Sequence, residues 1–301
     1  MKIATHPDAD GVTSAVLLVK GMKLEEGEYT VRFPEKFGDV RDEDYCLDMR
    51  PIDPDYEGTV IDHHPCHSED RKYTLIHGDV PASRLVYDQV KNDLTEKDDW
   101  KVVVGVSGDG QPEVTPNEIW ERHPELFDEV VSIYLKYGIE SMMSVYPNRV
   151  FSLLSSYINS ACRLFKPEIA FGVLKDATDV YDVINNTHLI NFKKKLYMIR
   201  KGVLENLEQV IQTRNFCFVM YSADARIEGV IASKIQQEIP KTIIALNQKT
   251  MSGSIRGVLS NWLVEKMNMI GIESGGHAGY AGFSITSSTQ IELIKKLIRK
   301  I

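Results

Sequence analysis

The sequence lacks the features that would point to a membrane-bound or disulfide-rich protein. It contains no stretch of about 18 apolar residues, the length that a membrane-spanning helix needs. The first residues run directly into an expected strand without the apolar segment of a signal peptide, so we expect a cytoplasmic protein with no membrane attachment. Cysteine is scarce and forms no CxxC pair, which argues against a disulfide framework or a zinc–thiolate site. The cysteines are Cys46, Cys66, Cys162 and Cys217.

Basic residues are also fewer than acidic residues. The chain has 35 lysine and arginine residues against 43 aspartate and glutamate residues, and its formal net charge is −8. A protein that follows a long nucleic acid usually presents a continuous basic face, and this composition does not favour one. Local basic groups occur at 193–195, 200–201 and 295–300, where their helical spacing is typical of solvated helix faces.

The sequence does contain a regular alternation of short apolar runs and helical patterns. Its 301 residues, 43% of them hydrophobic, are enough for two domains with well-packed cores. In the first half, apolar runs that alternate with helical segments are typical of a parallel α/β sheet. The predicted strands are 1–5, 28–33, 44–48, 58–61 and 101–106, and the predicted helices are 11–23 and 80–93.

The second half begins with a strand-poor region and ends with a smaller α/β pattern. From Glu118 to about Glu208 the periodicity is helical, including the long segment 189–211. We therefore expect a first domain over 1–188, a connecting helix over 189–211 and a second domain over 212–301. In the second domain the predicted strands are 216–221, 241–246 and 282–285, and the predicted helices are 228–238 and 289–300.

Four groups of acidic and imidazole side chains come where predicted strands end. Because the carboxyl ends of parallel strands meet at one edge of a sheet, these groups should converge on one crevice. Carboxylates with a few imidazoles and no thiolate suit Mn²⁺ or Mg²⁺, and so many ligands suit two ions about 3.5–4 Å apart that share a carboxylate. Such a pair activates water for attack on phosphorus. The groups are His6, Asp8 and Asp10; Asp48; Asp62, His63 and His64; and Asp109.

Each group taken singly also has a simple structural explanation. Asp-Ala-Asp-Gly and Gly-Asp-Gly are ordinary solvated turns, and paired histidines arise by chance. Asp109 is also explained as part of such a turn, without a role in metal binding. In that case the nearby Asp98 and Asp99 are the alternative metal ligands. The remaining histidines are interpreted as peripheral, surface or structural residues without carboxylate partners. They include His67, His77, His123 and His188.

Two segments of the second domain carry residues suited to phosphate. Gly275 and Gly276 would let backbone amides approach an anion, with His277 as a directional donor. The segment 252–257 contains an extended run that ends at Arg256, whose guanidinium could grip phosphate with two hydrogen bonds. A tight helix-to-strand turn is the structural alternative for the glycines, and the metal motif upstream favours phosphate binding over it.

These motifs, in this order, resemble the DHH phosphoesterase superfamily. His-x-Asp-x-Asp-Gly is followed by a single aspartate, then by Asp-His-His and Gly-Asp-Gly. The segment 274–284 resembles the glycine-rich signature of the DHHA1 partner domain, from which Ser274, Gly279 and Tyr280 depart. The superfamily includes RecJ-like exonucleases, nanoRNases, cyclic-dinucleotide phosphodiesterases and family II pyrophosphatases.

The resemblance spans nearly the whole chain and implies both a fold and a set of roles. The implied fold is α/β, with a parallel-sheet DHH domain joined by a helical connection to a smaller α/β DHHA1 domain. The implied cofactors are two Mn²⁺ ions, with Mg²⁺ or Co²⁺ as alternatives. By similarity, one ion is held by His6 and Asp8, the other is held by Asp10, His63 and Asp109, and Asp48 bridges the two ions. Asp62 and His64 are implied to be catalytic: Asp62 orients its neighbours, and His64 contacts the substrate phosphate or a third ion. The residues implied to bind substrate are Arg256, Gly275, Gly276 and His277.

The implied activity is metal-dependent hydrolysis of short single-stranded oligonucleotides to nucleoside monophosphates. The chain shows no extra region long enough for the OB-fold that RecJ-like enzymes acting on long DNA often have, which favours small substrates. A pAp phosphatase, a cyclic-dinucleotide phosphodiesterase, a RecJ-like single-strand exonuclease and an inactive replication-associated scaffold are alternatives. An inorganic pyrophosphatase is disfavoured by the glycine-rich second domain. Whether the chain forms a homo-oligomer is left open.

Overall fold

A five-stranded parallel sheet organises the first half of the chain, in the order β2-β1-β3-β4-β5. The strands are β1 (Lys2–Thr5), β2 (Thr30–Arg32), β3 (Tyr45–Leu47), β4 (Thr59–Asp62) and β5 (Thr74–His77). The computed structural model describes residues 1–34, 39–64, 71–129, 149–277 and 279–299, and 1–194 form one compact unit in it. Because all pairings are parallel, β1, β3 and β4 end side by side at one edge.

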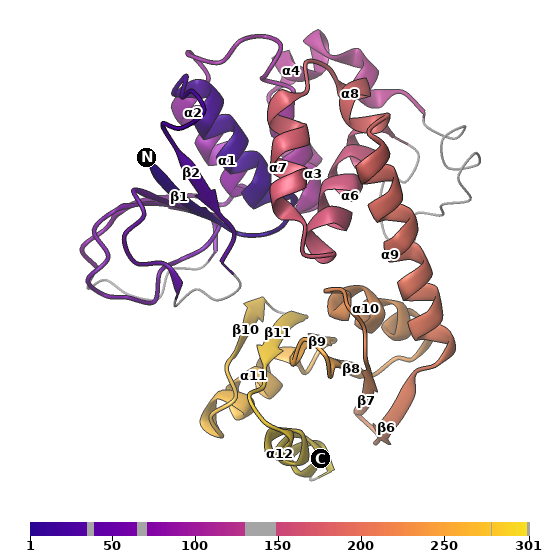
Figure 1. Ribbon diagram of the computed structural model, residues 1–301. Helices are drawn as coiled ribbons and strands as arrows, with labels where there is room; N and C mark the ends of the chain where they lie inside the picture. Colours follow the sequence, from indigo (N-terminus) through magenta and orange to yellow (C-terminus); the bar gives the residue numbers. More distant parts are fainter. Residues whose placement is uncertain (35–38, 65–70, 130–148, 278, 300–301) are drawn as a thin grey trace. The chain divides into compact units, whose positions relative to one another are not determined.

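Helices cover one face of this sheet, around the buried helix α1 (Ala9–Gly21) (Figure 1). The other helices of this unit are α2 (Ala82–Val90), α3 (Lys101–Gly108), α4 (Asn117–Arg122), α6 (Val150–Arg163), α7 (Pro167–Asp176) and α8 (Val180–Ile184), with 3₁₀ turns η2 (Pro112–Val114) and η3 (Pro124–Phe127). The Asp8 carboxylate accepts a hydrogen bond from the Gly11 amide at 3.0 Å and so caps α1. Because α1 packs against α2, α3, α6 and α7, the cap has a fixed position.

Alternate residues along the strands pack into two separate hydrophobic cores, because successive side chains of a strand point to opposite faces of the sheet. On the helical side the strands contribute Ile3, Leu47 and Ile61 to the main core. On the other side they contribute Ala4, Cys46 and Val60, which pack under loop residues that include Val40, Met49 and Tyr56. The three central strands β1, β3 and β4 are therefore buried on both faces and give the loops at their carboxyl ends a rigid base.

The segment 101–106 is a helix, so the prediction of a strand there was wrong. It forms most of α3, whose four valines in this segment are fully buried, because α3 is enclosed by α1, α2 and α6. A short run that is buried on every side shows no periodicity, and its sequence does not distinguish a buried strand from a buried helix. The strand β5, whose side chains are only partly buried, was not predicted.

The second unit, 195–301, contains a mixed six-stranded sheet in the order β10-β11-β9-β8-β7-β6. Its strands are β6 (Glu208–Gln212), β7 (Phe216–Tyr221), β8 (Thr242–Asn247), β9 (Ser252–Arg256), β10 (Ser274–His277) and β11 (Tyr280–Ser284). Its helices are α10 (Glu228–Glu238), α11 (Ser260–Met269) and α12 (Ser288–Arg299). The helix α9 (Thr187–Glu205) crosses the division between the units. The segment 208–211 lies in the mostly exposed edge strand β6, so the prediction that the helix continues to 211 was wrong.

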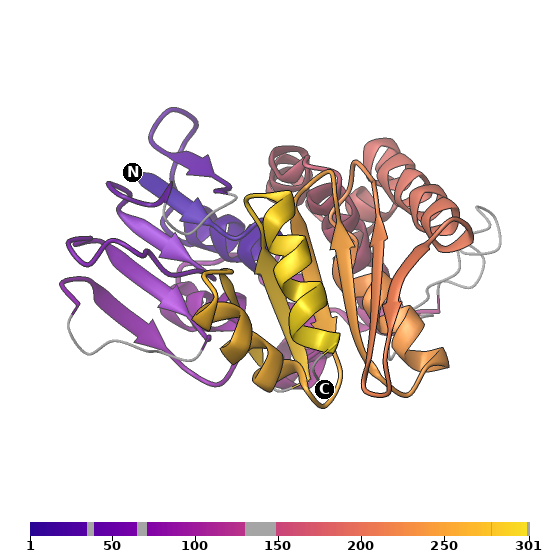
Figure 2. The same cartoon turned by 90° about the horizontal axis from the view of Figure 1, so that it is seen from below.

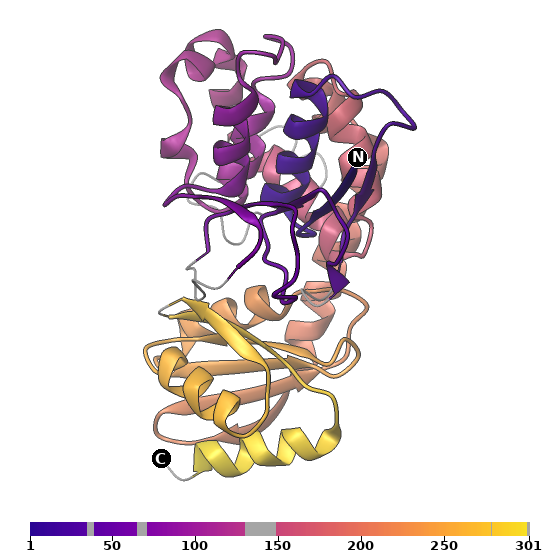
Figure 3. The same cartoon turned by 90° about the vertical axis from the view of Figure 1, so that its left-hand side faces the viewer.

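Helices lie on both faces of this second sheet (Figures 2 and 3). α11 and α12 share a hydrophobic core with one face, and α12 contributes Ile291, Ile294 and Ile298 at helical spacing. On the opposite face, α10 packs against β8 and β9. The predicted architecture, a parallel α/β unit followed by a smaller unit with its own sheet, is confirmed. None of the described helices is both long and apolar enough to cross a membrane.

Candidate metal centre

Strand ends and helix ends bring the predicted ligands of the first unit to one place. Their donor atoms form three groups, in each of which the atoms lie within 4.8 Å of one another. The groups are His6, Asp8 and Asp48; Asp10, His63 and Asp109; and Asp48, His63 and His64. The first two groups correspond to the ligand sets that the superfamily resemblance implies for two ions.

Asp48 lies between these groups. Its Oδ2 is 3.6 Å from His6 Nδ1, whereas its Oδ1 is 3.3 Å from His63 Nε2 and 4.0 Å from His64 Nδ1. The side chain is only 2% exposed, and Oδ1 accepts no hydrogen bond within the part of the chain that the structure describes. The backbone of Asp48 is left-handed, with φ 53°, a conformation that costs energy in a residue with a side chain. A buried carboxylate oxygen without a hydrogen-bond donor is suited to a cation.

Asp10 is fully buried and also supports the backbone. Its carboxylate accepts hydrogen bonds from the amides of Ala82 at 2.7 Å and Ser83 at 2.9 Å, and so caps the amino end of α2. Each carboxylate oxygen retains lone-pair capacity for a cation. Burial raises the pKa of Asp10 well above its usual range, and the charges of Asp48 and Asp109 raise it further. Without a cation nearby, ionisation of the Asp10 carboxyl group is therefore disfavoured.

Asp109 reaches the site from the carboxyl end of α3, not from a strand end as predicted. Gly108 allows this approach, because a Cβ there would lie 2.6 Å from the Ala9 Cβ at the start of α1. The Asp109 carboxylate, 3.1 Å from His63 Nε2, lies at the negative end of the α3 dipole. Burial raises the pKa of Asp109, with the neighbouring acids adding to the effect. A helix end that places an acid among other acids favours a bound cation.

The alternatives to Asp109 lie at the other end of α3 and have other partners. Asp98 forms an ion pair with the buried Lys101, and an Asp99 oxygen lies 2.7 Å from His123 Nε2. His123 Nδ1 is also 3.3 Å from Glu125, so the prediction that His123 has no carboxylate partner was wrong. These ion pairs secure the amino end of α3 and leave Asp109 as the acid that reaches the candidate centre.

A group of hydrogen-bonded polar side chains beside these ligands includes Arg50, a residue that the sequence analysis did not single out. Asp62 Oδ1 is 2.7 Å from His64 Nδ1, and Arg50 Nε donates a hydrogen bond to Asp62 Oδ2 at 2.8 Å. Burial opposes ionisation of Asp62, but its bonds to His64 and Arg50 prevail and lower its pKa. No local pattern in the sequence marks Arg50, which lies two residues after Asp48 in the loop beyond β3. His77, predicted to be structural, lies with Nδ1 2.8 Å from the Asp62 carbonyl oxygen.

The carboxylates also hold protons on the two ligand imidazoles. Desolvation lowers the pKa of His63, but Asp109 and Asp48 outweigh it and raise that pKa to about 11. Burial opposes protonation of His6 too, yet Asp8, whose Oδ2 is 2.7 Å from His6 Nδ1, and Asp48 raise its pKa well above the usual range. A metal ligand must be a neutral imidazole, so an ion and these protons compete for the same nitrogen atoms.

We therefore expect Mn²⁺ binding to release protons and to strengthen as pH rises. Below the raised pKa of His63 the metal-free imidazole is charged, and each proton that an ion displaces should change the apparent association constant about tenfold per pH unit. Calorimetry at pH 7 in two buffers of different ionisation enthalpy would count the protons. His63→Asn should release fewer protons than the wild type. A binding enthalpy that is the same in both buffers would contradict this account.

The donor set fits a hard divalent ion. The three groups offer carboxylate and imidazole atoms, and the buried Oδ1 of Asp48 accepts no hydrogen bond from the described residues. The nearby thiol of Cys46 instead donates to the Met49 carbonyl at 3.2 Å. Cys66 and His67 lie outside the described residues.

The predicted substrate-binding residues of the second unit lie on neighbouring strands. Arg256 ends β9, and its Nη1 donates to the carbonyl oxygens of Ile255 at 2.8 Å and Ala281 at 3.2 Å. Gly275 and Gly276 lie in β10 and pair with β11, which contradicts the alternative of a helix-to-strand turn. His277 is the last residue of β10. The signature is thus part of a hairpin beside the strand that carries Arg256.

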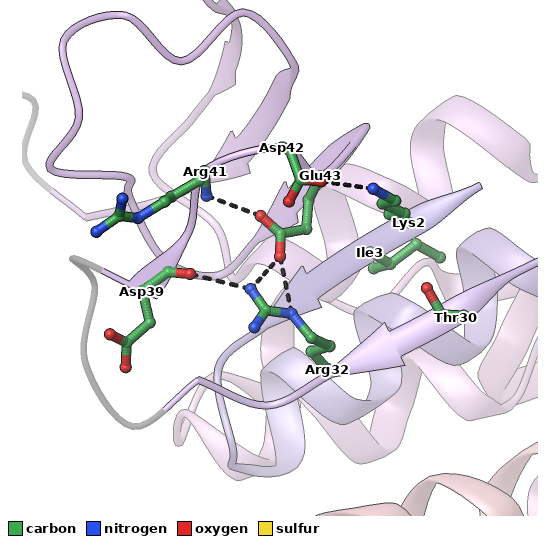
Figure 4. A pocket seen from close by; sticks show the side chains of 8 residues that line it. All are labelled: Lys2, Ile3, Thr30, Arg32, Asp39, Arg41, Asp42 and Glu43. Carbon is green, nitrogen blue, oxygen red and sulfur yellow. Dashed lines mark hydrogen bonds and ion pairs between the residues drawn. The ribbon is translucent and has the colours of Figure 1, made fainter.

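A cavity of about 380 Å³ lies at the opposite, amino-terminal edge of the first sheet (Figure 4). It is lined by Lys2, Ile3, Thr30, Arg32, Asp39, Arg41, Asp42 and Glu43. Four of its charged side chains form two ion pairs, Arg32 with Glu43 and Lys2 with Asp42. None of the candidate metal ligands lines it, and its ion pairs hold the loop before β3 against β1 and β2.

The fold and the convergence of the motifs define a protein with the DHH fold, as the sequence predicted. The structure is similar to the exonuclease RecJ bound to manganese, with a TM-score of 0.69, 16% identity, and coverage of 98% of this chain and 88% of that one. It is similar to RecJ from Thermus thermophilus in complex with Mn²⁺, with a TM-score of 0.71, 15% identity, and coverage of 100% of this chain and 52% of that one.

A third similar structure is the DHH domain of a protein that belongs to a family of ribosomal proteins. Its TM-score is 0.59 at 14% identity, with coverage of 100% of this chain and 86% of that one. No known family profile and no curated protein matches the sequence. At such low identities the likeness shows a shared fold, and this chain spans about half the length of the Thermus RecJ.

Proposed function

We propose that the protein is a phosphodiesterase that uses two divalent ions to hydrolyse short single-stranded oligonucleotides to nucleoside monophosphates. The observation that carries this proposal is the position of Asp48, which directs one carboxylate oxygen toward His6 and the other toward His63 and His64. A carboxylate between two ligand groups suits a bridge between two ions. The shared fold with manganese-bound RecJ supports the choice of Mn²⁺, with Mg²⁺ or Co²⁺ as alternatives.

The first unit would supply the ion-binding residues of this enzyme. His6 and Asp8 would hold one ion, Asp10, His63 and Asp109 the other, and Asp48 both. When bound, a pair of divalent ions activates water for attack on phosphorus and stabilises the leaving oxygen. The caps that Asp8 and Asp10 make on α1 and α2 fix two of these ligands to rigid helices before any ion arrives.

His64 would act on the substrate side of the reaction, and Asp62 would orient it. The hydrogen bond at 2.7 Å between Asp62 and His64 Nδ1 orients the imidazole, and Arg50 keeps Asp62 in place. Held in this orientation, the His64 side chain can contact a phosphate oxygen of the substrate and stabilise the charge that develops there. Arg50 is a positioning residue in this scheme, because it acts through Asp62.

The second unit would bind the nucleotide chain, with the DHHA1 domain proposed over 212–301. The Arg256 guanidinium is a suitable phosphate ligand, since two carbonyl oxygens already hold it in place. The net charge of −8 offers little attraction for a long polyanion. Short substrates therefore fit better than long strands, although the likeness to the exonuclease RecJ keeps a single-strand exonuclease as the second candidate.

We expect the specificity constant to be highest for substrates of two to five nucleotides and to fall as they lengthen. The test is product analysis with labelled oligonucleotides of two to twenty nucleotides, pAp and cyclic dinucleotides, each with Mn²⁺ and each repeated in excess EDTA. A steady rise with length, or processive digestion, would support the RecJ-like candidate instead. Cleavage of pAp or cyclic dinucleotides alone would replace the substrate class, and cleavage that survives EDTA would contradict a metal-dependent reaction.

A further inference from the structure

Tyr280 is an exposed aromatic residue on the strand that follows the glycine-rich signature, and it departs from that signature. It begins β11 and is 61% exposed, whereas its neighbours Ala281 and Phe283 along the strand are each 4% exposed. Because strand residues alternate between faces, Tyr280 lies on the face of the sheet turned away from the core that α11 and α12 cover. The hydrophobic core of this unit therefore does not account for the ring.

Arg256 gives this ring a fixed neighbour. The two residues are directly opposite in the antiparallel pairing of β9 and β11, and the guanidinium carbon lies 5.1 Å from the ring centroid, in the range of a cation–π contact. Its hydrogen bonds to two carbonyl oxygens keep the guanidinium in position. α10 also abuts it, since a Cβ on Gly229 would lie 2.6 Å from Arg256 Nη2. The aromatic ring and the cation thus form one rigid pair at the surface.

The strand backbone beside this pair is open. Gly282 lies two residues beyond Tyr280 on the same face and pairs with Gly275 of β10. A Cβ on Gly275 would meet no atom within 4 Å, and one on Gly282 would meet only the Gly253 carbonyl oxygen, at 3.8 Å. Gly276 differs, because its φ of 144° requires glycine. Packing within the unit therefore does not explain Gly275 and Gly282, and glycine in a strand often marks the close approach of another group.

We propose that Tyr280 stacks on a nucleobase of the substrate while Arg256 holds the adjoining phosphate. This inference rests on the proposed function and narrows its substrate class to phosphodiesters that carry a base next to the bound phosphate. The flat glycine backbone gives the base room to lie against the ring. Stacking on an aromatic side chain tolerates any base sequence, because every base has a π face. The site would therefore discriminate against phosphates that carry no base, and it would not distinguish one nucleotide from another by its base.

The test compares two dinucleotide probes on the full chain in EDTA, where no hydrolysis intervenes. One carries 2-aminopurine, whose fluorescence falls when it stacks, and the other carries an abasic residue at that position and a dye on its other nucleotide. Tyr280→Ala should bind the first probe about tenfold to a hundredfold more weakly and lose the quenching, with little change for the abasic probe. Tyr280→Phe keeps the ring and should behave like the wild type.

The outcomes separate this inference from the proposed function. Equal weakening of both probes by Tyr280→Ala, or no weakening of the 2-aminopurine probe, would overturn the stacking role, and so would a wild type that binds neither probe. Quenched, Tyr280-dependent binding in a protein that hydrolyses no phosphodiester with Mn²⁺ would overturn the proposed function and support the base site. Hydrolysis of both probes with Mn²⁺ at equal specificity constants would support the phosphodiesterase and overturn the base site.

Discussion

Replacing Asp48 with asparagine is expected to lower kcat by roughly a thousandfold or more, because two ions can supply several kcal/mol of transition-state stabilisation and each 1.36 kcal/mol is tenfold in rate. Asparagine keeps the shape of the side chain and tolerates the left-handed backbone at this position, so the fold should survive. It removes the charge that faces both ligand groups. Steady-state kinetics with Mn²⁺, together with elemental analysis of the bound ions, would measure the effect.

The matched control for this substitution is Asp93→Asn. Asp93 is an exposed acid whose ion-pair partner is the surface residue Lys23, so its loss should change neither turnover nor metal content. Circular dichroism and thermal unfolding would verify that both variants are folded. An Asp48→Asn protein that turns over at the wild-type rate, or that still holds two ions with wild-type affinity, would exclude Asp48 as the bridge.

Asp109→Asn is expected to weaken binding of one ion by more than about a hundredfold and to leave the other in place. The substitution removes a carboxylate from the group that also contains Asp10 and His63, but leaves the group of His6 and Asp8 intact. Replacing residues that merely support a ligand already costs tenfold to a hundredfold in metal affinity, so loss of the ligand itself should cost more. Calorimetric titration with Mn²⁺ should show one tight site where the wild type shows two.

Asp93→Asn again serves as the surface control. If Asp109→Asn kept both tight sites, the tripeptide Gly108–Gly110 would be the ordinary turn that its sequence also allows. If it lost both ions together, the two ligand groups would not be separable, and the assignment of Asp109 to one ion would be wrong.

The convergence of the polar groups could be predicted because it follows from the geometry of a parallel sheet. Residues after β1, β3 and β4 must meet at one edge, whatever the details of the loops, and the donor atoms of His6, Asp48 and His63 do so. The same rule does not predict the position of Asp109, because Asp109 follows a helix and not a strand. Its proximity to Asp10 depends on the close packing of α3 on α1 at Gly108, a tertiary contact that has no local signature.

The element type of α3 and the role of Arg50 could not be predicted for different physical reasons. A run of valines favours a strand by local propensity, yet burial between three helices stabilises it as a helix, so tertiary packing prevails. Arg50 lies in the loop after β3, and its pairing with Asp62 depends on the path of that loop to the end of β4. The glycine-rich segment was identified by its resemblance to the DHHA1 signature, whereas its hairpin conformation depends on the pairing of β10 with β11 and of β11 with β9.

The most direct test of the central claim is to locate Mn²⁺ in crystals of the protein by anomalous diffraction at the manganese edge. The account predicts two anomalous peaks, one on each side of Asp48, with Oδ2 of Asp48 beside the ion at His6 and Asp8, and Oδ1 beside the ion at His63 and Asp109. A single peak at full Mn²⁺ occupancy, or two peaks that do not share Asp48, would contradict it.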